Sequence, residues 1–155
     1  MSEELDEFGN FLNAFPANRL LLGRAHNEGF LIEGLILYAN LVDGLLRIAL
    51  ILKSQIDNKN SYIDKKLISQ SNKEYIAERE VYKISLSLKI INETLYTKIN
   101  KLYDFRNSVV HRFFLTSLEY KHLPEHLIKY ENIYEELYQI VYSLEALLQL
   151  LRSLL

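Results

Sequence analysis

Residues that interrupt helices are scarce in this chain and gather near its start. The 155 residues include two prolines and five glycines, and every glycine lies before residue 45. Proline cannot donate a backbone hydrogen bond inside a helix, and glycine loses more conformational entropy there than other residues. Long stretches without either residue favour helices over a fold with many turns. The sequence therefore predicts an all-α protein.

Apolar residues recur at helical spacing along two long segments. The first stripe advances in alternating four- and three-residue steps, which predicts one long helix over residues 18–53. The second keeps a seven-residue repeat, typical of a helix that packs at a shallow angle against another helix, and is expected over residues 125–155. The first stripe comprises Leu31, Leu35, Tyr38, Val42, Leu45, Ala49 and Leu52, and the second comprises Tyr130, Tyr134, Leu137, Val141, Leu144, Leu148, Leu151 and Leu155.

Shorter elements are expected before and after the first long helix. A helix over residues 3–14 should end near Pro16, because proline disrupts a helix interior. The polar segment 54–60 is expected to form a loop, and residues 61–69 are expected to contain a short helix.

Capping signals mark two further helices. Ser71 and Glu74 have the spacing of a capping box, which predicts a helix over residues 71–90. Asn92 suits the N-cap of the next helix, and a connection is expected over residues 116–124. Together these elements predict a single domain spanning residues 1–155, built as an up-and-down bundle of four main helices with one or two short ones.

Composition excludes several classes of protein. The chain has no cysteine, which excludes disulfides, thiol catalysis and cysteine-built zinc sites. The start of the chain is acidic, unlike the basic start of a secretory signal, so we expect a cytoplasmic protein. Glu33, Asp43 and Arg47 interrupt the most apolar segment, residues 30–52, so we expect a buried helix and no membrane contact. The formal net charge of −2 argues against a non-specific nucleic-acid binder.

Arg106, Asn107 and His111 form the most distinctive segment of the chain. Arg106 falls on an apolar stripe between Leu102 and Val109, where a charge is costly unless a partner satisfies it. Without such a partner, removal of Arg106 would stabilise the fold. Asn107 and His111 lie one helical turn apart on one face, whereas Arg106 and His111 diverge by ~140° on an ideal helix. One straight helix therefore does not aim both at the same atom, but a second copy of the helix across a dimer axis would bring them together.

The chemistry of these three side chains suits phosphoryl transfer. Histidine titrates near neutral pH and can move a proton. A guanidinium matches a phosphate and can stabilise the negative charge of a transition state. Asn107 can orient the histidine or bind substrate, and nothing in the set requires a metal.

This segment resembles the signature of the HEPN superfamily, in which an arginine, a polar residue that is often asparagine, and a histidine lie late in a helix of a small helical bundle. The resemblance implies a homodimer whose two motifs form one cleft and cleave RNA without a metal or other cofactor. His111 would act on the ribose 2′-hydroxyl, and Arg106 would stabilise the phosphate. Many members are toxins or antiviral defence components, and some pair with an antitoxin that is a nucleotidyltransferase. One branch carries a tyrosine that this partner modifies, and here Phe113 stands at that position, so we do not expect that control.

Two other functions stay open for this motif. The chain could be a catalytically inactive HEPN-like module that binds nucleotides or proteins. It could also be a purely structural helical dimer, in which Arg106 forms an internal salt bridge and His111 is a partly buried helix residue. An RNA-cleavage assay in EDTA would separate these alternatives from the enzyme.

Several further residues are candidates for supporting roles. Asn40 and Asp43 are expected to reach Arg106 or His111, although a buried hydrogen bond without a catalytic role explains them equally well. Basic residues exceed acidic ones by three between residues 98 and 129, which fits a surface that faces RNA. Lys101, Arg112 and Lys121 are the candidate RNA contacts in this segment.

Two histidines near the start of the last expected helix have a spacing that zinc sites use. His122 and His126 are four residues apart, with Glu125 between them. Pro124 also lies between them and disfavours a regular helix through both, so no metal site is expected.

Overall fold

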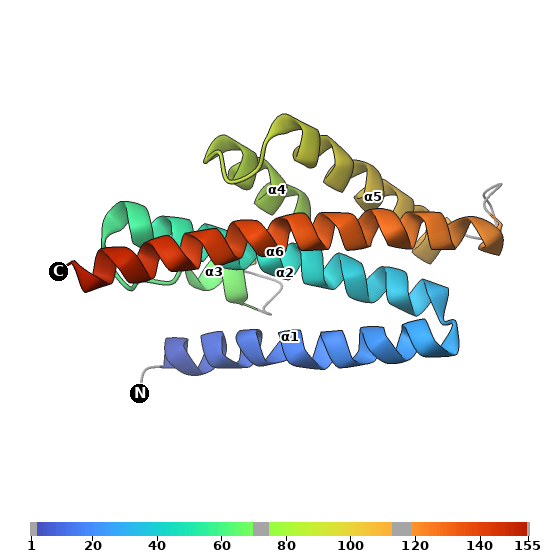
Figure 1. Ribbon diagram of the computed structural model, residues 1–155, viewed down its shortest axis with the longest axis horizontal. Coiled ribbons are helices and arrows are strands. Elements are labelled where there is room, and N and C mark those ends of the chain that lie inside the picture. Colours follow the sequence, from blue (N-terminus) through green and yellow to red (C-terminus); the bar gives the residue numbers. More distant parts are fainter. Residues whose placement is uncertain (1–2, 70–74, 113–118, 155) are drawn as a thin grey trace.

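The described part of the chain is helical throughout its regular structure, which confirms the all-α prediction (Figure 1). This computed structural model describes the backbone of residues 3–69, 75–112 and 119–154. Its long helices run in alternating directions along the bundle, as expected of an up-and-down arrangement. In chain order the elements are α1 (Glu3–Glu28), α2 (Leu31–Asn58), α3 (Lys65–Ile68), α4 (Glu78–Ser87), α5 (Glu93–Arg112), a 3₁₀ turn (Tyr120–His122) and α6 (Leu123–Ser153).

The first two helices have different boundaries from those predicted. α1 continues through Pro16, an exposed residue, and the expected helix over 18–53 is instead divided at Gly29. Gly29 has a φ of 72°, a left-handed conformation that glycine adopts without steric cost. The backbone N–H of Phe30 then donates to the carbonyl of Ala25 at 2.8 Å, which satisfies an end of α1. The chain therefore reverses at Gly29, and α2 begins at Leu31.

The middle of the chain also departs from prediction in detail. α2 extends through Asn58 into the expected loop at 54–60. The short helix expected within 61–69 is α3, capped by the side chain of Asp64. α4 begins at Glu78 and ends at Ser87, so it is shorter than the helix expected over 71–90. Ser71 and Glu74 lie outside the described residues.

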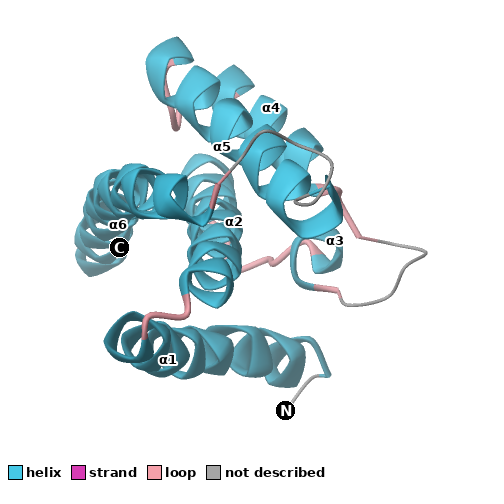
Figure 2. Ribbon diagram, turned by 90° about the vertical axis from the view of Figure 1, so that its right-hand side faces the viewer, coloured by secondary structure: helices cyan, strands magenta, loops and turns pink. Residues whose placement is uncertain are grey.

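α2 is the centre of the bundle, with α1, α6 and the α4–α5 pair arranged around it (Figure 2). Leu35, Leu46 and Ala49 of α2 are fully buried, as is Leu137 of α6. By length and composition α2 is also the one described helix that could cross a membrane, and 61% of its most apolar window is buried. Its packing is that of a core helix.

Contacts with its neighbours hold α5, the helix that carries Arg106 and His111. The Asn92 side chain accepts a hydrogen bond from the Leu95 backbone N–H at 2.8 Å, so the predicted N-cap is confirmed. Farther along, the Tyr130 hydroxyl of α6 donates to the buried carbonyl of Leu102 at 2.9 Å. α6 begins at Leu123, slightly before the expected start, and Pro124 occupies its first turn, where no N–H is needed.

Candidate functional site

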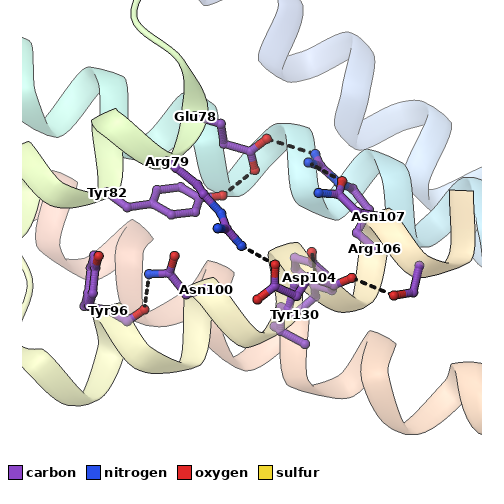
Figure 3. A network of polar contacts seen from close by, with 11 residues as sticks. Glu78, Arg79, Tyr82, Tyr96, Asn100, Asp104, Arg106, Asn107 and Tyr130 are labelled. Carbon is purple, nitrogen blue, oxygen red and sulfur yellow. Dashed lines mark hydrogen bonds and ion pairs between the residues drawn. The ribbon is translucent and has the colours of Figure 1, made fainter. Parts of the chain in front are cut away.

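Arg106, on the inner face of α5, is held by three side chains, of which Figure 3 shows Glu78 and Asn107. Its Nη1 lies 3.0 Å from Oε2 of Glu78, and Nε and Nη2 both donate to Oδ1 of Asn107, at 3.2 and 3.0 Å. The guanidinium also lies over the Tyr103 ring, 4.7 Å from its centroid. The Arg106 and Glu78 side chains are 18% and 19% exposed, so the ion pair is largely shielded from water. The guanidinium is thus fixed in orientation within a single chain.

Glu78 connects this pair to the start of α4. One oxygen of its carboxylate faces Arg106, and the other accepts a hydrogen bond from the Tyr82 hydroxyl. Burial raises the pKa of the Glu78 carboxyl and of the Tyr82 hydroxyl, because both are less solvated when charged. Burial acts to lower the pKa of Arg106, but attraction and hydrogen bonding to Glu78 outweigh it and leave that pKa raised. Arg106 therefore stays charged at neutral pH.

A second ion pair joins the same two helices nearer the surface. Arg79 of α4 pairs with Asp104 of α5, and its guanidinium lies over the Tyr103 ring at 4.6 Å. Both arginines therefore contact one aromatic ring, which fixes α4 against α5 beside the motif.

His111 lies apart from Arg106 in the single chain. It sits in the last turn of α5, one turn after Asn107, and its side chain is exposed. Within the described residues no hydrogen bond or ion pair links His111 to Arg106. The structure therefore brings Arg106 and Asn107 together but not His111, in agreement with the divergence expected on one helix.

The two candidates from α2 behave differently. Asp43 interacts electrostatically with Arg106, but its Oδ2 accepts a hydrogen bond from Arg47 at 2.7 Å. Its buried Oδ1 has no hydrogen-bond partner among the described residues, and burial raises the pKa of this carboxyl. Asn40 is exposed and lines a surface hollow shared with α1 and α3. Asp43 is therefore close enough to influence Arg106, whereas Asn40 makes no described contact with the motif.

The candidate RNA contacts lie on the outside of the bundle. Lys101 is exposed on α5 and has no acidic partner within 4.0 Å in the described ranges. Lys121 is exposed and pairs with Glu119 at 2.6 Å. Arg112 is the last residue of α5, and its side chain lies outside the described structure.

The two histidines with metal-like spacing have other contacts. His122 accepts a hydrogen bond at Nδ1 from the backbone N–H of Glu119, at 3.2 Å. The His126 ring stacks on Phe105 with 3.5 Å between ring centroids. Across residues 3–69, 75–112 and 119–154, no group of three or more potential ligands is placed to hold a metal ion.

Sequence reasoning missed Glu78 and Tyr103, which contact Arg106 beside Asn107, and Tyr82, which bonds to Glu78. Glu78 and Tyr82 are four residues apart, and this spacing alone indicates that they face the same side of α4. Nothing in the sequence pairs Glu78 with Arg106, because that contact depends on how α4 packs on α5.

No model of a known protein family, no curated protein and no solved structure matches this chain. The HEPN resemblance therefore stays a prediction from the short motif of Arg106, Asn107 and His111.

Proposed function

We propose that the protein is a metal-independent endoribonuclease of HEPN type that acts as a homodimer with a composite site. The observation that carries the proposal is the arrangement on α5, where Arg106 is fixed by Asn107 and Glu78 while His111 is exposed one turn beyond Asn107. The guanidinium is a charged group of the kind that binds phosphate, held in one orientation, and the exposed imidazole is accessible to a substrate.

The proposed reaction needs a proton carrier and a charge stabiliser on opposite sides of one phosphodiester. His111 takes the proton from a ribose 2′-hydroxyl, the 2′ oxygen bonds to phosphorus, and the bond from phosphorus to the 5′ oxygen breaks. Water returns a proton to the leaving 5′ oxygen. Arg106 stabilises the charge on the phosphoryl oxygens during this step. Because Arg106 and His111 diverge within one chain, a second copy supplies the missing half of each site.

A toxin or antiviral defence protein is the expected setting for this activity, with an antitoxin or nucleotidyltransferase as the expected partner. Constitutive RNA cleavage harms a cell, so such an enzyme requires control by a partner or a trigger.

RNA cleavage in EDTA tests the proposal directly. The parental protein should degrade single-stranded RNA without added metal, and His111→Ala should lose about 10²–10⁴-fold in rate. His26→Ala is a matched control, since His26 is exposed on α1, a helix for which the described structure records no contact with α5. If EDTA abolished cleavage and magnesium or manganese restored it, the mechanism would be wrong.

A second candidate function is favoured by one observation. Glu78, Asn107 and Tyr103 already satisfy the Arg106 guanidinium, which is what an internal structural salt bridge requires. We therefore keep a HEPN-like binding module or a structural helical dimer as the alternative. It predicts a folded, stable protein that shows no RNA cleavage under any metal condition.

A further inference from the structure

A groove between α5 and α6 lies outside the Arg106–Glu78 cluster. Its volume is about 450 Å³. Leu102 of α5 and Ile133 of α6, both buried, contribute apolar surface to it. An apolar lining with a few polar groups is the usual composition of a small-molecule or nucleotide site.

Three lysines surround this groove, Lys98 and Lys101 from α5 and Lys129 from α6. Their side chains are exposed, and the one carboxylate in the lining is that of Glu136, 4.0 Å from Lys98. Lys129 pairs with Glu125 of its own helix at 2.6 Å, whereas Lys101 has no acidic partner in the described parts of the chain. The groove is therefore locally positive on a chain whose net charge is −2.

His126 and Asn132 add polar groups from α6. The His126 ring is fixed against Phe105, and its buried Nδ1 has no hydrogen-bond partner among the described residues. A buried polar atom without a partner costs free energy. Burial lowers the pKa of His126, so the ring is neutral at neutral pH. A neutral imidazole has one nitrogen that donates a hydrogen bond and one that accepts. The Asn132 amide offers a donor and an acceptor.

We propose that this groove binds nucleotide phosphate, with the lysines on the phosphate and with Asn132, His126 and the apolar lining against the sugar or base. The intended ligand is single-stranded RNA, and in this respect the inference rests on the proposed function. Lys101 and His111 lie on one helix ten residues apart, or about 15 Å along its axis. A short stretch of RNA held in the groove therefore reaches the end of α5 that carries His111.

Binding is measured without cleavage in a His111→Ala background, by fluorescence anisotropy with a short labelled single-stranded RNA. The test variant replaces Lys98, Lys101 and Lys129 with Gln. The control variant replaces Lys59, Lys83 and Lys89 with Gln, an equal change in charge at lysines outside the groove. Circular dichroism and size-exclusion chromatography confirm that each variant is folded.

The groove variant should bind RNA at least tenfold more weakly, and its salt slope should fall by about 0.7 for each lost phosphate contact. The control variant should stay within about twofold of the background protein, because Lys59, Lys83 and Lys89 do not line the groove and would lose no phosphate contact there. Equal binding by the two variants would overturn the proposal.

Binding of AMP, measured in the same way, distinguishes a site for free nucleotides from a site for RNA. Lysine-dependent binding of AMP without binding of RNA would assign the groove to free nucleotides, and binding of neither probe would overturn the site. If the parental protein cleaves RNA but replacing the three lysines does not weaken RNA binding, the groove proposal is refuted and the proposed function is not. If replacing the lysines weakens RNA binding but the parental protein never cleaves RNA, the proposed function is refuted and the groove proposal is not.

Discussion

Arg106 shows how a single charged residue is accommodated on an apolar helix face. Its guanidinium is removed from most solvent, and the lost hydration is offset by an ion pair to Glu78 and hydrogen bonds to Asn107. Tyr82 donates a hydrogen bond to Glu78, and Tyr130 donates one to the backbone of α5, the helix that carries Arg106 and Asn107. The result is a positioned cation whose removal leaves a buried carboxylate behind.

Arg106→Ala should destabilise the protein, and His111→Ala should not. Without Arg106, the half-buried Glu78 has no counter-charge, which should cost about 1–3 kcal/mol of unfolding free energy. His111 is exposed, so its replacement should change stability by less than about 0.5 kcal/mol. Urea unfolding of both variants measures the difference. Under the proposed function both lose RNA cleavage, so a folded Arg106→Ala protein that cleaves at the parental rate would remove Arg106 from the mechanism.

Glu78→Gln should change how stability depends on pH. Because the folded-state pKa of Glu78 is raised above its usual 4.5, the folded state binds this proton more tightly than the unfolded state. The Glu78 contribution to stability is therefore greatest at low pH and is lost as pH rises through the raised pKa. The glutamine variant lacks this term, so its stability relative to the parent should improve as pH rises from 4.5. Melting temperatures measured at increasing pH from 4.5 test whether the variant gains stability relative to the parent. Glu80→Gln, at an exposed residue of the same helix, is the control.

At the scale of helices, the sequence predicted which segments form helices better than it predicted where those helices begin and end. Periodicity located α2 and α6, because burying an apolar stripe requires a helix at that position. The reversal at Gly29 was missed, because apolar spacing continues on both sides of it. Glycine can also lie inside a helix as well as end one, so its presence alone does not locate a reversal. Pro16 was expected to end a helix, but it lies on an exposed face of α1 where the lost hydrogen bond is tolerated. Boundaries thus depend on local backbone geometry that residue spacing does not encode.

Gly29→Ala and Gly23→Ala should shift stability in opposite directions. Alanine at position 29 must adopt the left-handed conformation with φ of 72°, which should cost about 1 kcal/mol. Gly23 lies inside α1, and a Cβ there meets nothing within 4 Å. Alanine at 23 should therefore stabilise the fold by about 0.5–1 kcal/mol. Denaturant unfolding measures both, and a stabilising Gly29→Ala would contradict the assigned end of α1.

At the scale of the whole molecule, the bundle leaves apolar side chains uncovered on α6. Tyr142 and Leu150 of α6 are 62% and 57% exposed, and Leu154, which follows its last residue, is 75% exposed, whereas the inner residues of α6 pack along α2. Contiguous apolar patches mark surfaces that meet another protein, whereas single exposed apolar side chains are common on any protein. The divergence of Arg106 and His111 could be predicted from the helical angle alone, but the internal partner of Arg106 could not. The proposed composite site would therefore depend on assembly, which a single chain does not specify.

Mixing two inactive variants tests the dimer and the composite site together. The protein should be a homodimer by light scattering at micromolar concentration, and a monomer would count strongly against the composite site. In a mixed dimer of Arg106→Ala and His111→Ala chains, one subunit supplies Arg106 and the other supplies His111. If each working site takes its arginine and histidine from different subunits, one of the two sites in a mixed dimer is intact. Random pairing in equal amounts makes about half of the dimers mixed, so the refolded sample should recover about a quarter of the parental rate. If each site used both residues of one chain, the mixture would stay as inactive as either variant alone. Refolding the two variants together from urea allows subunit exchange, and the doubly substituted chain mixed with itself gives the baseline.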